Sequence, residues 1–181
     1  ALTIPAAAAL KLAEQLLILH ILRLHGDRLS GILHRLRIVV QTCLRHVNEA
    51  DGSLYFEDWA DKREMLPFIK YLKTDAAEAE IMTGTQDRAA AARMLAGWGA
   101  GEVMITHNSE VIVFDGRDLI ACPLRPRNLS GRTGRGDTTF AAYLNERLGH
   151  SIKDALLFAA ATVSLKMETP GPFRGNRRDV E

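Results

Sequence analysis

The sequence lacks most of the features that mark disulfide-rich, metal-dependent and membrane proteins. Its two cysteines, Cys43 and Cys122, are far apart and form no C-x-x-C pair, which argues against a disulfide framework and predicts a reducing compartment, the cytoplasm. The six histidines show no H-E-x-x-H or comparable spacing, so a structural metal is not expected. Between Pro5 and Leu24 the longest uncharged stretch, residues 15–22, is far shorter than the roughly 18 residues that a membrane span requires.

The sequence also lacks an excess of charge of either sign, with 23 Lys and Arg residues against 22 Asp and Glu residues. No overall attraction to nucleic acid or to an anionic membrane follows, and we predict neither as a partner. The length of 181 residues fits one domain of ordinary size with a single core.

Residues 1–37 are rich in alanine and leucine after Pro5 and contain few charges. This composition predicts a helix that is buried or covered by a partner. A cleaved targeting segment is the competing interpretation, and Glu14, Asp27 and the absence of serine enrichment argue against it. We treat residues 1–37 as a helical segment of unclear origin.

From Arg37 onward, strand-like and helix-like segments alternate. Strands are predicted at 37–47, 71–73, 102–106, 111–114 and 119–121, a turn at 48–53, and helices within 55–70, at 87–98, from 137 onward and at 151–169. Asp87 and Ser151 have side chains that favour helix N-caps. Alternation of this kind is typical of βαβ units, so we predict an α/β fold with a largely parallel sheet flanked by helices.

The most informative stretch is residues 130–143, SGRTGRGDTTFAAY. Three glycines (Gly131, Gly134 and Gly136) precede Asp137, where a helix is predicted to begin. Glycines let the backbone approach a ligand closely, and the first turn of a helix presents unpaired N–H groups. The stretch therefore predicts an anion site with a carboxylate at its mouth. The helix is expected to bury one face: Phe140, Leu144 and Leu148.

Two familiar phosphate loops do not fit this stretch. A P-loop needs Lys-Ser/Thr after the second glycine of G-x-x-x-x-G, whereas Asp137 and Thr138 follow Gly136. The dinucleotide fingerprint fails because Thr139 stands where its third glycine belongs. A loop that holds a transferring phosphoryl group on backbone N–H donors, while the carboxylate accepts the proton of an attacking hydroxyl, does fit.

The segment GRGDTTFAAY resembles the G-x-G-D-T-x-F-x-A signature of the ribokinase/PfkB family of carbohydrate kinases. The resemblance implies a ribokinase-like fold and an ATP-dependent phosphotransferase that acts on an alcohol of a sugar or sugar-like substrate. It assigns Asp137 as the catalytic base, and Gly134, Arg135 and Gly136 as the anion hole. The competing interpretation is a glycine-rich turn that Asp137 caps.

The segment TDAAEAEIMTG resembles a second family motif, N-x-x-E followed by a hydrophobic pair and T-G. The resemblance implies that Glu78, together with Asp75 in place of the asparagine, organises Mg²⁺ around the phosphates through water. The alternative is that Asp75 caps a helix and that Glu78 and Glu80 are its solvated acids.

The resemblance also places a nucleotide site on the loop, at the end of the strand 102–106 and on the last helix. The residues that it implies there are Thr106, Asn108, Thr133, Thr138, Ala160 and Ser164. Asn108 replaces the glycine of the T-x-G that the family commonly has. For the small residues of the last helix, close helix packing is an equally good explanation.

The resemblance covers residues 38–173, and the di-glycine motif, most sugar-binding residues and the β lid of the family are not visible. We therefore predict a nucleotide-binding, catalytic domain at 38–181, truncated on its N-terminal side, behind the segment 1–37. Three classes stay open: a kinase that uses ATP and Mg²⁺, a nucleotide-binding module without turnover, and a helical interaction protein built on residues 1–37. A homodimer is compatible with each.

Overall fold

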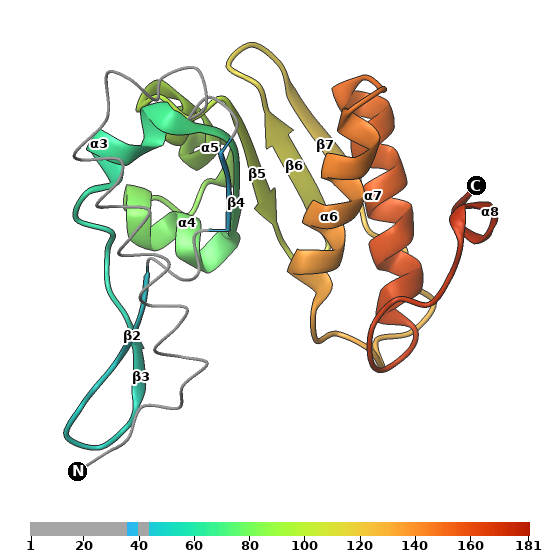
Figure 1. The fold of residues 1–181 in the computed structure, drawn as a ribbon, viewed down its shortest axis with the longest axis horizontal. Helices are drawn as coiled ribbons and strands as arrows, with labels where there is room; N and C mark the ends of the chain where they lie inside the picture. Colours follow the sequence, from blue (N-terminus) through green and yellow to red (C-terminus); the bar gives the residue numbers. More distant parts are fainter. Residues whose placement is uncertain (1–35, 40–43) are drawn as a thin grey trace.

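The computed structural model describes residues 36–39 and 44–181 and shows a sheet between two layers of helices (Figure 1). The predicted helix within 1–37 and the centre of the predicted strand 37–47 lie outside the described residues. The strands of the sheet follow the spatial order β1 (Leu36–Val39), β4 (Ile69–Asp75), β5 (Glu102–Thr106), β6 (Glu110–Phe114) and β7 (Leu119–Pro123).

The sheet is mixed. Strands β1, β4 and β5 run parallel, whereas β6 and β7 are joined to β5 by hairpins and pair antiparallel. The second hairpin turns at Asp115, whose side chain accepts hydrogen bonds from the N–H groups of Arg117 and Asp118 at 2.9 and 2.7 Å. The predicted α/β class is confirmed, with its parallel part on the β1 side of β5.

Helices cover both faces of the sheet (Figure 1). Helices α4 and α5 lie on one face, and α6 and α7 on the other. The helical segments are α3 (Lys62–Met65), the 3₁₀ turn η1 (Leu66–Phe68), α4 (Ala76–Thr83), α5 (Arg88–Gly97), α6 (Arg135–Arg147), α7 (Ile152–Met167) and α8 (Arg177–Val180). No helix within the described ranges is both long and apolar enough to cross a membrane.

Each central strand contributes to two cores because successive side chains point to opposite faces. On β5, Val103 and Ile105 belong to the core under α4 and α5, whereas Met104 belongs to the core under α6 and α7. On β4, Leu72 faces the first core and Tyr71 the second. The unbroken apolar run at 103–105 of β5 follows from burial on both faces.

Helix starts agree with the sequence at two predicted caps. Asp87 accepts hydrogen bonds from the N–H groups of Ala89 and Ala90 at 2.9 and 3.2 Å and is the N-cap of α5. Ser151 accepts one from the N–H of Asp154 at 3.1 Å and is the N-cap of α7. Both predictions are confirmed.

The buried face of α6 differs from the prediction. The helix begins at Arg135, two residues before the expected start, and its buried residues include Phe140 and Tyr143. Leu148 was expected beside Phe140 but is 75% exposed. It follows the last helical residue, where the chain turns away, so the four-residue spacing no longer places it over the sheet.

Residues 45–56 form a separate hairpin. Strands β2 (Arg45–Val47) and β3 (Leu54–Phe56) pair antiparallel and project away from the main sheet (Figure 1). The predicted turn between them is confirmed by the hydrogen bond from the N–H of Asn48 to the carbonyl of Ser53 at 2.8 Å. The short helix predicted within 55–70 is confirmed at 62–65, while Tyr55 and Phe56 before it are aligned with β2 by this closed turn.

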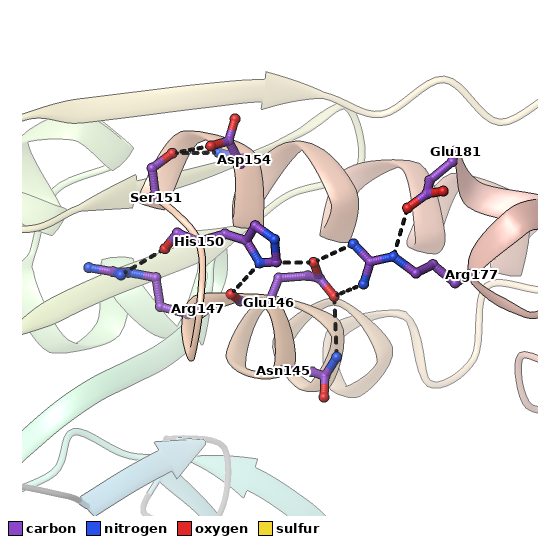
Figure 2. Close-up of polar contacts among 8 residues, drawn as sticks. All are labelled: Asn145, Glu146, Arg147, His150, Ser151, Asp154, Arg177 and Glu181. Atoms are coloured by element: carbon purple, nitrogen blue, oxygen red, sulfur yellow. Dashed lines mark hydrogen bonds and ion pairs between the residues drawn. The ribbon is translucent and has the colours of Figure 1, made fainter.

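The C-terminal segment is fixed to the body by a buried carboxylate on α6 (Figure 2). Glu146 is 4% exposed and accepts two hydrogen bonds from Arg177, at 2.8 and 3.0 Å. Asn145 donates a third, at 3.2 Å. Arg177 also binds Glu181 and lies over the ring of Phe158, 4.9 Å from its centroid. One side chain thus joins α8 to both α6 and α7.

This arrangement predicts a pH-dependent contribution to stability. The hydrogen bonds from Arg177 hold the pKa of Glu146 below its ordinary value of 4.5. The Glu146–Arg177 pair therefore stabilises the folded state fully above pH 4.5, and this stabilisation is lost as the pH falls through the lowered pKa. We expect Glu146→Gln to lower the free energy of unfolding by about 1.5–3 kcal/mol at pH 7. Urea unfolding should show this difference shrinking toward pH 3. Glu181→Gln removes the exposed partner of Arg177 and should cost less than about 1 kcal/mol; equal losses in both variants would contradict the assignment.

Candidate functional site

The site lies at the carboxyl ends of the parallel strands β4 and β5. Asp75 and Thr106 end these strands and are neighbours in the register. The glycine loop reaches the same edge before α6 begins, which is where α/β sheets commonly bind ligands. The cavity beside the glycine loop, which is called the main cavity below because it holds the loop, has a volume of about 190 Å³. It is lined by Lys73, Asp75, Glu78, Thr106, Arg132, Gly134, Arg135, Gly136 and Asp137.

The main cavity brings together residues that lie far apart in the sequence. It contains all four residues predicted to be catalytic (Asp137, Gly134, Arg135 and Gly136) and the predicted metal pair Asp75 and Glu78. Of the residues predicted to bind nucleotide, it contains Thr106.

Asp75 and Glu78 form a capping box at the start of α4. Asp75 accepts a hydrogen bond from the N–H of Glu78 at 2.9 Å, and Oε2 of Glu78 accepts one from the N–H of Asp75 at 2.8 Å and one from the hydroxyl of Thr74 at 3.2 Å. The interpretation of Asp75 as a cap is confirmed. The interpretation of Glu78 as a solvated acid is wrong, because its side chain is 2% exposed. Each carboxylate keeps one oxygen that has no hydrogen bond to a described residue.

Gly134, not Asp137, is the N-cap of α6. Gly134 has φ +76°, the left-handed region that favours glycine, and no side chain caps the helix. Asp137 is the third helical residue, and its exposed carboxylate has no hydrogen bond or ion pair within the described residues. The interpretation of Asp137 as a cap is therefore wrong, and its carboxylate is available to a ligand.

The start of the glycine loop is fixed to the end of α7. The N–H of Gly131 donates to the carbonyl of Met167 at 2.8 Å, and the carbonyl of Gly131 accepts from the ammonium of Lys166 at 2.6 Å. A Cβ atom at Gly131 would lie 1.9 Å from the carbonyl oxygen of Thr169, so this contact admits no side chain. The position of the loop thus depends on glycine at residue 131.

Two arginines of the loop converge on one amide. Asn108 accepts hydrogen bonds from Arg132 at 3.0 Å and from Arg135 at 2.5 Å. Burial, and then the positive charge of Arg132, lower the pKa of Arg135, while Asp75 acts in the opposite sense. Because a neutral amide holds both guanidinium groups, their positive charge remains available to an anion.

The remaining residues predicted to bind nucleotide are spread over four places. Asn108 lines a second cavity, of about 380 Å³, which also contains Asp75, Thr106 and Arg135 of the main cavity. Thr133 is exposed on the loop, and Thr138 lies in the first turn of α6. Neither lines the two cavities.

Ala160 and Ser164 are buried in the packing of α7. The hydroxyl of Ser164 donates to the carbonyl of Ala160 at 2.6 Å and accepts from the N–H of Arg125 at 2.9 Å. Neither residue lines the two cavities, so their role at a nucleotide remains a prediction.

Sequence reasoning missed Lys73 and Arg132. Lys73 is the fifth residue of β4 and is 5% exposed. Its position could have been used to predict a site residue. Lys73 lies near the carboxyl end of a buried strand, two residues before the N-x-x-E-like segment, and that end of the strand faces the site. Arg132 was hidden among several arginines of the loop, and the sequence did not show which of them point inward.

The structure gives little support for a metal cage made of protein ligands alone. Within the ranges 36–39 and 44–181, no three His, Cys, Asp or Glu side chains are grouped closely enough to hold a metal ion. Mg²⁺ commonly needs only one or two carboxylates when phosphates and water complete its ligands. The unbonded oxygens of Asp75 and Glu78 meet that smaller requirement.

Comparison with known proteins identifies the family. A model of the pfkB family of carbohydrate kinases matches residues 9–177. The chain belongs to this family. The predicted resemblance is confirmed, and the match begins earlier than residue 38, within the segment whose origin was unclear.

Similar proteins include kinases with different donors and acceptors. A cytidine kinase from Thermococcus kodakarensis is 36% identical over 85 residues, which are 45% of this chain and 31% of that protein. A pyrophosphate-dependent kinase of the ribokinase family, solved with a pyrophosphate analogue and myo-inositol, is 39% identical with a TM-score of 0.75, over 84% of this chain and 56% of that one.

Arabidopsis thaliana ribokinase, solved with ribose and ATP, is 25% identical with a TM-score of 0.61, over 68% of this chain and 42% of that one. These structures confirm the ribokinase-like fold. The chain spans between about a third and just over half of the length of the relatives that it matches.

The contact between the loop and α7 predicts the effect of a minimal substitution. Gly131→Ala should push the loop away from the Thr169 carbonyl and lower the free energy of unfolding by about 1–3 kcal/mol, the usual cost of overpacking. Gly149→Ala is the control, because a Cβ atom there would meet nothing within 4 Å, and it should change stability by less than about 0.5 kcal/mol. Urea unfolding of both variants tests this; a neutral Gly131→Ala would show that the loop is not fixed at this point.

Proposed function

We propose that this chain carries the phosphoryl-donor site and the general base of a kinase that phosphorylates an alcohol of a sugar or sugar-like substrate, nucleosides included. The observation that carries the proposal is the free carboxylate of Asp137, which lies in a cavity with basic side chains and the first turn of α6. Membership of the pfkB family supports it.

The start of α6 differs from other helix starts in a way that suits a base. In α4, α7 and α8 the third helical residue is acidic, and its side chain bonds either the N-cap backbone or the N-cap side chain: Glu78 with Asp75, Asp154 with Ser151, and Asp179 with Asn176. Asp137 has the same position in α6, but its N-cap is a glycine with no side chain. Its carboxylate is thereby left free to accept a proton.

The chemistry proposed for the site is an in-line displacement. The alcohol oxygen forms a bond to the terminal phosphorus of the donor while its proton passes to the carboxylate of Asp137. The bond between that phosphorus and the bridging oxygen breaks, and the donor leaves with this oxygen, as ADP if the donor is ATP. The N–H of Thr138 bonds the Gly134 carbonyl at 3.0 Å. The N–H groups of Gly134, Arg135 and Gly136 come before it, at the helix start, where backbone N–H groups have no partner within the helix. They are the proposed donors to the moving phosphoryl group.

Charges in the main cavity are balanced but not paired. Lys73, Arg132 and Arg135 supply three positive charges, and Asp75, Glu78 and Asp137 supply three negative ones. No ion pair joins these six side chains. Such a site suits a polyphosphate accompanied by a divalent cation. Mg²⁺, which neutralises phosphate charge when bound, would be held by Asp75 and Glu78 together with phosphate oxygens.

ATP is the donor that the family resemblance implies, and pyrophosphate is a second candidate. The pyrophosphate-dependent kinase that matches 84% of this chain favours pyrophosphate. The burial of Ala160 and Ser164 in helix packing also favours pyrophosphate, since an adenine ring could contact neither side chain in this arrangement. A nucleotide-binding module without turnover is the alternative to catalysis, and the free Asp137 argues against it.

Calorimetry with ATP, tripolyphosphate and pyrophosphate distinguishes the donors. If ATP is the donor, its adenosine should contribute affinity, and ATP should bind at least tenfold more tightly than tripolyphosphate in the presence of Mg²⁺. If pyrophosphate is the donor, the inorganic anions should bind as tightly as ATP or more tightly. A folded sample that binds none of them at millimolar concentration would contradict the proposed function.

Asp137→Asn tests the base. We expect phosphoryl transfer by the full-length protein to fall by a factor on the order of 10² to 10⁴, because the amide cannot accept the proton. Donor binding should stay the same or tighten slightly, since a negative charge beside the phosphates is lost. Asp154→Asn changes the same helical position of α7 outside the site and should leave transfer unchanged. Transfer at the parent rate by Asp137→Asn would remove the catalytic assignment.

A further inference from the structure

Strand β4 carries a buried lysine whose ammonium has no protein partner. Lys73 is 5% exposed, and within the described residues it makes no hydrogen bond and no ion pair. It pairs with Met104 in the register and so lies on the sheet face covered by α6 and α7. A Cβ atom added to Gly136 would lie 2.8 Å from its Nζ atom, which places the ammonium directly against the first turn of α6.

Other lysines near Lys73 do not share this property. Lys166 is also buried, but its ammonium donates to the carbonyl of Gly131 at 2.6 Å. Lys70, on the same strand, is exposed and lies over the ring of Tyr71. The Lys73 ammonium is not among the fully buried polar atoms without a partner in the described residues, so it opens into the cavity that it lines. A largely buried lysine whose unpaired ammonium faces a cavity points to an anionic partner that arrives with a ligand.

The carboxylates in the same cavity do not provide that partner. Asp75 and Glu78 are held by the capping box of α4, and neither forms an ion pair with Lys73. Asp137 is the third helical residue of α6, immediately after Gly136, and it also makes no ion pair with Lys73. The ammonium therefore lies beside the N–H groups proposed to hold the moving phosphoryl group.

We propose that Lys73 binds the phosphoryl group of the donor at the point where it is transferred, and that it is a catalytic residue of this site. The proposal rests on the proposed function and deepens it. An ammonium is a strong point charge for phosphate. Because Lys73 lies against Gly136 beside Asp137, it should contact the group that moves rather than the part of the donor that leaves, so ATP and pyrophosphate should need it equally.

Lys73→Met, with Lys70→Met as the matched control on the same strand, tests the proposal by two readouts. Calorimetry should show pyrophosphate, and ATP where it binds, binding at least tenfold more weakly to Lys73→Met in the presence of Mg²⁺, and unchanged binding to Lys70→Met. Thermal unfolding without ligand should show a higher Tm for Lys73→Met than for the parent, because a charge without a partner, on a largely buried side chain, has been replaced by an apolar side chain of similar length. A merely structural lysine would give a lower Tm.

Two further variants keep the test decisive if Lys73→Met folds poorly. Lys73→Arg keeps the charge and should lose less affinity than Lys73→Gln, which keeps only the polarity.

The outcomes separate this proposal from the proposed function. If the parent binds pyrophosphate or ATP and the Lys73 variants bind them as tightly, the assignment of Lys73 is wrong and the proposed function stands. If the parent binds neither anion, the proposed function is wrong and the assignment falls with it. A tenfold loss in Lys73→Met with a raised ligand-free Tm supports both.

Discussion

The arrangement of the site depends on one close backbone contact, between the glycine loop and the end of α7. At Gly131 the chain approaches the carbonyl oxygen of Thr169 so closely that a Cβ atom would lie 1.9 Å from it. The hydrogen bonds from Gly131 to Met167 and from Lys166 to Gly131 hold the two segments in this position. Since α6 starts four residues after Gly131, the contact also determines where its first turn points. The apolar face of helix α7 packs on the sheet, so the packing of the core determines the position of the glycine loop.

Charged groups in the main cavity are held by neutral partners or by none. Asn108 holds two arginines, backbone N–H groups hold Asp75 and Glu78, and Lys73 and Asp137 have no partner among the described residues. Groups that are fixed but not neutralised keep their charge for a ligand, and they need little reorganisation when it binds. The same side chains, paired with one another, would stabilise the fold more and the ligand less.

Much of this fold and part of the site could be predicted from the sequence. Local signals were sufficient where the cause is local: Asp87 and Ser151 cap their helices, and the glycine run leads into α6, which begins two residues earlier than predicted. For the hairpin β2–β3 the sequence predicted the first strand and the turn but not β3, because Tyr55 and Phe56 are followed by charged residues and the mixture also suits a short helix. Lys73 was missed for a different reason. Its burial depends on α6, which comes more than sixty residues later in the sequence, and no periodicity shows which helix will cover a given strand.

The glycine at the N-cap of α6 has a consequence for how this protein tolerates sequence change. In an ordinary helix a serine or asparagine cap is more stabilising than a glycine cap by a few tenths of a kcal/mol, so selection for stability alone would favour the change. At Gly134 the left-handed backbone opposes that change. A cap side chain would also engage Asp137 as Ser151 engages Asp154. Substitution of Gly134 by a capping residue is thus disfavoured for two reasons: the backbone conformation there suits glycine, and the Asp137 carboxylate would no longer be free to accept a proton.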